Sequence, residues 1–381
     1  MRKNLENNSH LYIFIILIAL FAILTGGDIL SPMNVSSLFL QNSHIFILVA
    51  GMTICMCKKG NLDISIGSFI CFVCAMGGVF LSILKLGTPL SIILLFVVGI
   101  LWGCLVGFII SYCNVPAWVA TLGGYLTFRG LGTAILNNFS ATGSITGIPD
   151  SFIRLFSGKM FRSDLNSFGV SSLIVCILLA VIGIVCKIIL TKKEGLPITP
   201  KYYIVSAVFL LLSVFIGTSF ARTGGIPVPF LWMIITVGIP AFWLDATTKG
   251  RKLVMLGSNP ANATLGGVDT KKAVLLTYVF MALCSTLSAC IVLAKFHAAS
   301  SYAGVNFEMD VIAACVIGGV SVYGGKQEIL GAVMGAVLIG IINLGLSLLG
   351  INMTGQMILK GIIILLAISL DIFIKRQDTR R

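Results

Sequence analysis

The sequence predicts an all-α protein, a polytopic transmembrane helical bundle of about 12 spans with both termini in the cytoplasm. Three observations support this prediction. Of the 381 residues, 57% are hydrophobic and only 10% are charged, whereas a soluble domain carries about 25% charged residues. The mean hydropathy is +1.06, an excess of apolar surface that lipid can cover and a soluble core cannot. The basic residues, finally, gather in alternate loops, as they do in polytopic membrane proteins.

A spanning helix needs about 20 mostly apolar residues, all of whose backbone groups are paired within the helix. Run 308–323 is short, so a re-entrant helix is the alternative there. Run 229–245 is also short and opens on Pro227 and Pro229. The predicted spans are 11–30, 36–57, 62–84, 89–112, 116–136, 170–190, 202–220, 229–245, 272–296, 308–323, 327–349 and 353–374.

The first run has a second interpretation, because residues 1–30 also resemble a signal peptide in length. The apolar stretch continues to Leu24, and the following LTGGDILSP lacks a clear small-x-small cleavage site. We therefore expect a retained first helix.

Orientation follows from the lysines and arginines of the loops. With the N-terminus inside and strict alternation, 18 of the 26 basic residues lie on the cytoplasmic side, 7 lie outside, and Lys360 falls within a span. This asymmetry predicts an even number of spans with both termini in the cytoplasm. It also accounts for the net charge of +13 without a nucleic-acid partner.

The 11 cysteines lie almost entirely inside apolar runs, where cysteine often acts as a small buried hydrophobe. The pairs in CMC (55–57) and CFVC (71–74) raise the question of a metal site. None of the three histidines is close enough in sequence to complete a ligand set. We expect no metal, no disulfide framework and no cofactor in this chain.

A charged turn, KKGNLDISIGS (58–68), separates two apolar runs. Asn61 and Asp63 are suited to capping the start of the next helix, where negative charge is favourable. The alternative is that Asp63 lies deeper and faces the protein interior, since charges inside a membrane usually mark function. The sequence leaves both interpretations open.

The longest polar segment on the predicted inner side is residues 246–271. Within it, NPANATLGG predicts a short helix with Asn259 as its cap, Pro260 in the first helical position and glycines after its end. Such a helix at the membrane surface is suited to docking a cytoplasmic partner. An ordinary basic inner loop is the alternative.

Motifs of catalysis are absent from the sequence. There is no HExxH, no GxSxG in a strand–turn–helix context and no GxxxxGK[ST] phosphate-binding loop. We therefore do not expect an enzyme, and ATP-driven transport would need a separate ATPase subunit.

Three motifs, in the same order along the chain, carry a resemblance to a known family. GNLDISIGS (60–68), GRKLVMLGSNPANATLGGV (250–268) and the glycine-rich stretch that begins MDVIAACVIGG (309–350) resemble the permeases of bacterial ABC importers for ribose, xylose, arabinose and galactose. The resemblance covers about 12–375, except for roughly 160–222, which contains two apolar runs joined by a basic hairpin. An inserted pair of helices on a ten-span core at this point is similar to the xylose and multiple-monosaccharide type.

The resemblance implies a multi-pass permease in the bacterial cytoplasmic membrane, with lipid around it. It also implies a second permease copy, a cytoplasmic ATPase subunit with two nucleotide-binding domains, and an extracytoplasmic sugar-binding protein. The resemblance implies that residues 246–271 form the loop that docks the ATPase. The residues implied within this loop are Arg251, Gly257, Asn259, Ala263 and Gly266.

Sugars need polar donors and acceptors in an otherwise apolar wall. The candidates have structural alternatives too: Asp63, Glu308 and Asp310 can cap helices, Asn114 precedes Pro116 in a turn, and Asn343 lies in a packed glycine-rich helix. Other cargo (nucleosides, autoinducers, branched-chain amino acids) and an ion-coupled carrier remain alternative hypotheses. The candidates for the translocation pathway are Asn61, Asp63, Ser65, Asn114, Thr121, Glu308, Asp310 and Asn343.

Overall fold

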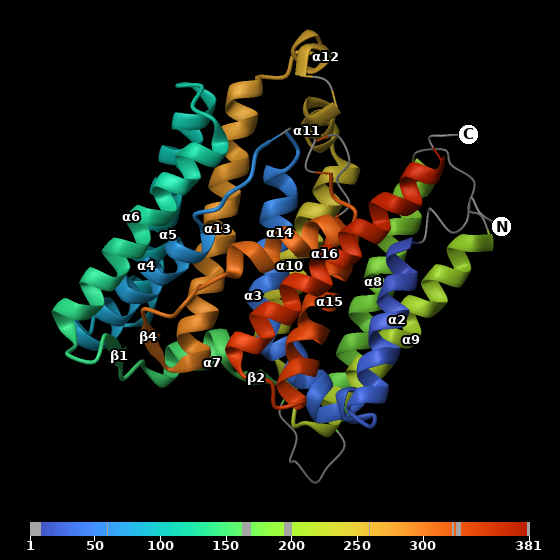
Figure 1. The fold of residues 1–381 in the computed structure, drawn as a ribbon, viewed down its shortest axis with the longest axis horizontal. Helices are drawn as coiled ribbons and strands as arrows, with labels where there is room; N and C mark the ends of the chain where they lie inside the picture. Colours follow the sequence, from blue (N-terminus) through green and yellow to red (C-terminus); the bar gives the residue numbers. More distant parts are fainter. Residues whose placement is uncertain are drawn as a thin grey trace.

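The computed structural model describes residues 9–58, 60–161, 169–193, 200–258, 260–321, 324 and 329–378. Its helices form one bundle, shown in Figure 1. They are α2 (Ser9–Leu24), α3 (Pro32–Cys55), α4 (Ile66–Gly78), α5 (Thr88–Ser111), α6 (Ala117–Phe139), α7 (Asp150–Ser157), α8 (Val170–Lys193), α9 (Pro200–Arg222), α10 (Val228–Ala246), α11 (Thr248–Ser258), α12 (Pro260–Leu265), α13 (Thr270–Phe296), α14 (Phe307–Ile317), α15 (Ile329–Leu348) and α16 (Met353–Asp378).

Among the described residues, seven helices are long and apolar enough to cross a membrane, and an eighth is added if α10 and α11 form one span across a bend of 84°. The prediction of a polytopic helical membrane protein is confirmed at this level. A helix lies in each of the twelve predicted runs, but several are too short or too polar to count as spans by themselves. The number of spans and the side on which the termini lie therefore stay predictions.

Three predicted runs differ from the observed helices; in one of them, 308–323, α14 ends at Ile317. The run 11–30 is broken, since α2 ends at Leu24 and Gly26 and Gly27 take positive φ angles before the 3-10 turn η1 (Asp28–Leu30). The run 62–84 begins with an extended segment, continues as α4 from Ile66 and ends in a π-helical turn, η2 (Val79–Ile83). Apolar composition alone does not distinguish these backbone shapes.

The fold is predominantly helical, as predicted, and two short antiparallel ribbons join loops at one end of the bundle. β1 (Ser144–Thr146) pairs with β4 (Ala298–Ser300), and β2 (Lys159–Met160) pairs with β3 (Ile226–Pro227). Loop backbones that cross each other satisfy their polar groups by pairing. Figure 1 shows the ribbons at the end opposite to α11 and α12.

The core lies around α3 and α13. Most of α3 is buried, from Val35 to Cys55 with few gaps. Helix α5 packs closely on α13 because Gly99, Gly103 and Gly107 follow one another at four-residue intervals on its contact face; a methyl group on any of them would meet α13. Small residues at this spacing allow close approach of membrane helices.

Helices α8 and α9 pack mainly on each other, and α9 also contacts α3. Only 17% of the residues in the most apolar segment of α8 are buried, and only 22% of those in the most apolar segment of α9. The pair therefore lies at the periphery of the bundle, to the right in Figure 1.

Helix α14 is too short to cross a membrane. Its 11 residues extend about 16 Å, about half of the thickness of the hydrocarbon core. It packs against α3, α15 and α16. Figure 1 places it near mid-height of the bundle. Its first turn carries two acidic residues, Glu308 and Asp310, so charged groups lie where the surroundings are apolar.

Candidate functional site

Two helices begin side by side inside the bundle, α4 at Ile66 and α14 at Phe307. The first turn of α4, at Gly67, meets the turn before α14 at Gly304, which has a φ of +73°. A methyl group on Gly304 would overlap the carbonyl oxygen of Gly67, and one on Gly67 would overlap the Glu308 carboxylate and the carbonyl of Gly304. This contact, possible only without side chains, brings the predicted polar residues of both segments into one region.

The extended segment before α4 is buried, with exposed fractions of 5% for Asn61, 2% for Asp63 and 0% for Ser65. One oxygen of Asp63 accepts hydrogen bonds from the backbone N–H of Ser65 at 2.9 Å and from its hydroxyl at 2.6 Å. Asp63 therefore lies in the protein interior, in agreement with the second interpretation. It does not cap α4, because Ser65 holds the N-cap position and no side chain makes a capping hydrogen bond there.

The same region holds polar groups with no hydrogen-bond partner among the described residues: Nδ2 of Asn61, the hydroxyls of Ser68 and Tyr278, and Oε2 of Glu308. Buried polar groups are usually hydrogen-bonded, and each exception calls for an explanation. Thr121, in contrast, donates to the carbonyl of Ala117 at 2.9 Å and lies within 3.4 Å of that of Leu62. Donors and acceptors are thus present here in excess of what the protein itself uses.

Arg129 of α6 fixes the turn that leads into α14. Its guanidinium donates to the carbonyl oxygens of Ser301 and Ala303, both at 3.0 Å. The ring of His44 stacks on Phe307, the first residue of α14, with 4.1 Å between ring centroids. The position of α14 is therefore fixed from two sides, by a charged donor from α6 and by a ring from α3.

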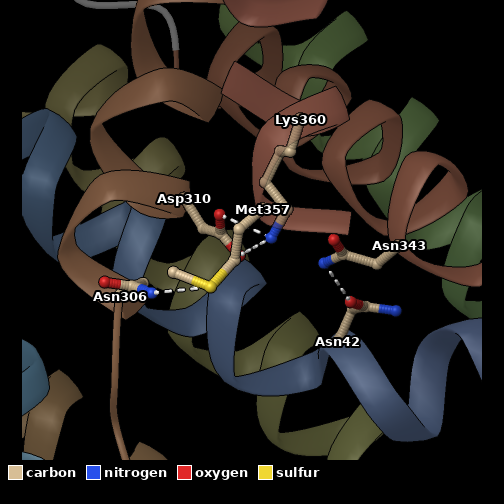
Figure 2. A network of polar contacts seen from close by, with 6 residues as sticks. All are labelled: Asn42, Asn306, Asp310, Asn343, Met357 and Lys360. Carbon is tan, nitrogen blue, oxygen red and sulfur yellow. Dashed lines mark hydrogen bonds and ion pairs between the residues drawn. The ribbon is translucent and has the colours of Figure 1, made fainter. Parts of the chain in front are cut away.

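A row of polar side chains crosses from α14 to α3, as Figure 2 shows. Lys360 of α16 contacts both carboxylate oxygens of Asp310, at 3.0 and 2.9 Å. Asn343 of α15 donates to Oδ1 of Asn42 on α3 at 3.3 Å. Asn306 lies at 3.9 Å from the sulfur of Met357 on α16. One polar row thus joins α3 to α14, α15 and α16, which are consecutive helices far from α3 in the sequence.

The structure groups seven of the eight candidates for the pathway near the α4 and α14 starts. Asn114 is not among them; it takes a positive φ of 56° in the exposed turn between α5 and α6, in agreement with the turn alternative. Sequence reasoning did not place Asn42, Arg129 or Tyr278 in this site. Lys360 was noticed as a charge within a span, and that rarity was the available signal.

The predicted docking segment forms α11 and α12 at the end of the bundle opposite to the ribbons, as Figure 1 shows. Helix α12 begins at Pro260, as the sequence predicts, and Gly267 ends it with a φ of +73°. Ala263 and Gly257 are buried, whereas Arg251 and Gly266 are exposed. Leu265 is 87% exposed. Asn259 lies outside the described residues.

In the described part of the chain no group of three or more His, Cys, Asp or Glu side chains is placed to hold a metal ion. The eleven cysteines are free thiols, and eight of them are buried. What the described residues offer around the starts of α4 and α14 is a set of hydroxyl, amide and carboxylate groups. Such a set can exchange hydrogen bonds with a polar solute.

Comparison with known proteins identifies the family. Residues 34–368 match the family described as "Branched-chain amino acid transport system / permease component". The chain belongs to this permease family. The resemblance to sugar-importer permeases is confirmed by relatives along nearly the whole chain.

Three relatives are sugar permeases by name. The xylose transport system permease protein XylH of Haemophilus influenzae is 29% identical over 97% of this chain and 98% of its own length. XylH of Escherichia coli K12 is 29% identical over 97% of this chain and 94% of its own. The ribose import permease protein RbsC of H. influenzae is 29% identical over 94% of this chain and 91% of its own length. No solved structure matches the chain with significance.

Proposed function

We propose that this permease is the membrane-spanning subunit of an ATP-driven importer that carries a monosaccharide, xylose or a related aldose, across the bacterial cytoplasmic membrane. The observation that supports this most is the similarity to xylose permeases along 97% of the chain. It covers α8 and α9 as well as the helices on either side of them. In this proposal 160–222 is an inserted pair of spans on a ten-span core with both termini in the cytoplasm.

The partners belong to the same proposal. A second copy of the chain completes the pathway, a cytoplasmic ATPase subunit with two nucleotide-binding domains binds 246–271, and an extracytoplasmic sugar-binding protein delivers the cargo. The permease alternates between a state open to the outside and a state open to the cytoplasm. The ATPase drives the switch because it binds these two states with different affinity. The exposed Leu265 and Gly266 at the end of α12 are suited to such a contact.

The test is reconstitution in liposomes with the ATPase and the binding protein. We expect uptake of labelled xylose that needs ATP and both partners. Uptake by this chain alone, driven by a proton or sodium gradient, would show an ion-coupled carrier instead. The name of the matched family supports a second cargo class. Leucine taken up in place of sugar, with the cognate binding protein, would support that alternative.

For the docking segment we expect Gly266→Trp to uncouple ATP hydrolysis from transport, because a large side chain at the exposed end of α12 separates the two surfaces. Hydrolysis should continue while uptake falls by at least about tenfold, a coupling loss of ordinary size. The control is Gly183→Trp on α8, which is exposed like Gly266 and where an added side chain meets nothing within 4 Å. Normal coupling in Gly266→Trp would remove this segment from the ATPase contact.

A further inference from the structure

The Asp310–Lys360 ion pair is mostly buried, but part of both side chains reaches the surface of the chain. The side chains keep 10% and 18% of their surface exposed, respectively. Asn306, Asn343 and Gln356 are also partly exposed, and Met357 is 52% exposed. The edge of this polar row therefore reaches the surface of the single chain.

In the proposed topology, in which α16 is a span, this surface lies at a depth where lipid would be hydrocarbon. Lys360 comes seven residues after Met353, the first residue of α16, which is about 10 Å along the helix. Asp310 sits in the first turn of α14, near mid-height of the bundle in Figure 1. Ionised side chains at such depth face protein or a water-filled cavity, since exposing them to acyl chains is costly.

Helix α16 has a different surface on its other side. Ile358 and Ile362 are 60% and 49% exposed, and both are purely apolar. Each is two residues from Lys360, so each points about 200° away from it around the helix. One side of α16 thus suits lipid, whereas the side with Lys360 and Met357 does not.

We propose that the face formed by Asp310, Lys360, Met357 and Asn343 is the wall of a water-filled path, and that the Asp310–Lys360 pair exchanges hydrogen bonds with the hydroxyl groups of an uncharged sugar in that path. The inference rests on the proposed function and adds Lys360 as a residue that contacts the cargo.

The chemistry of the pair fits a polyhydroxylated, uncharged solute. A carboxylate only accepts hydrogen bonds and an ammonium only donates them, so adjacent hydroxyls of a sugar can donate to Asp310 and accept from Lys360. The pair has no net charge, which suits an uncharged cargo. Because the two charges already bind each other, a sugar competes with an existing contact, and its binding stays weak enough for release.

The experiment measures water access in the assembled transporter. Met357→Cys is made in a chain whose exposed Cys104 and Cys113 are replaced by serine, and is treated with a charged methanethiosulfonate in membranes opened to both sides. Ile358→Cys, at the same depth and similarly exposed, is the matched control. We expect Met357→Cys to react at least about tenfold faster, because only it faces water. We also expect sugar with the binding protein and ATP to slow that reaction.

Equal reaction rates of the two cysteines would overturn the proposal. Reaction unchanged by sugar would remove the cargo contact and leave only a water-filled cavity. Absence of xylose uptake by the unmodified complex would instead refute the proposed cargo, and the reagent's access to Met357→Cys would still report on the path.

Discussion

Replacing Gly304 by alanine is expected to destabilise the protein by about 2–5 kcal/mol. Its φ of +73° disfavours any side chain, which costs about 1–2 kcal/mol. The new methyl group would also overlap the carbonyl of Gly67, and overpacking of this kind costs about 1–3 kcal/mol. The clash is with backbone, so relief requires α4 and the turn before α14 to move apart.

The measurement is thermal unfolding in detergent, followed with a dye that fluoresces on reaction with thiols, since the eight buried cysteines become accessible only on unfolding. The control is Gly130→Ala on α6, which has nothing within 4 Å of the added methyl and should be neutral or stabilising by up to about 1 kcal/mol. An unchanged unfolding temperature in Gly304→Ala would show that the crossing of α4 and α14 is looser than described.

Some elements could be predicted from local signals. Helix α12 follows from Pro260 and the glycines after Leu265, because capping chemistry is local in sequence. The apolar runs identify the membrane helices, since a span must satisfy its backbone within itself. The pairing of β1 with β4 joins Ser144 to Ser300, and no local pattern predicts a contact between residues so far apart.

The candidate site could also be predicted in part from local signals in the sequence. Asp63, Glu308 and Asp310 stand out because charges are rare in apolar runs. Their arrangement depends on tertiary contacts: Gly67 and Gly304 are two of 41 glycines, and nothing in the sequence marks them as the pair that lets α4 and α14 meet. The partner of Asp310 is 50 residues away, on another helix.

Neutralising Lys360 alone is expected to be among the most damaging substitutions in this chain. In Lys360→Met the side chain keeps its length and apolar stem, but Asp310 loses the ammonium that contacts both of its oxygens. Removing one partner of a buried pair costs about 3–5 kcal/mol, because the remaining charge is uncompensated. We expect a lower unfolding temperature and less monodisperse protein after extraction.

The double variant Asp310→Asn, Lys360→Met separates charge compensation from the shape of the site, since replacing both ions by neutral groups of similar size is often nearly neutral for stability. We expect it to unfold close to the temperature of the unmodified chain. Lys360→Arg, which keeps the charge, should also be stable. If Lys360→Met alone unfolds at the unmodified temperature, the ion pair does not stabilise the fold, and α14 is fixed by Arg129 and the Gly67–Gly304 contact without help from α16.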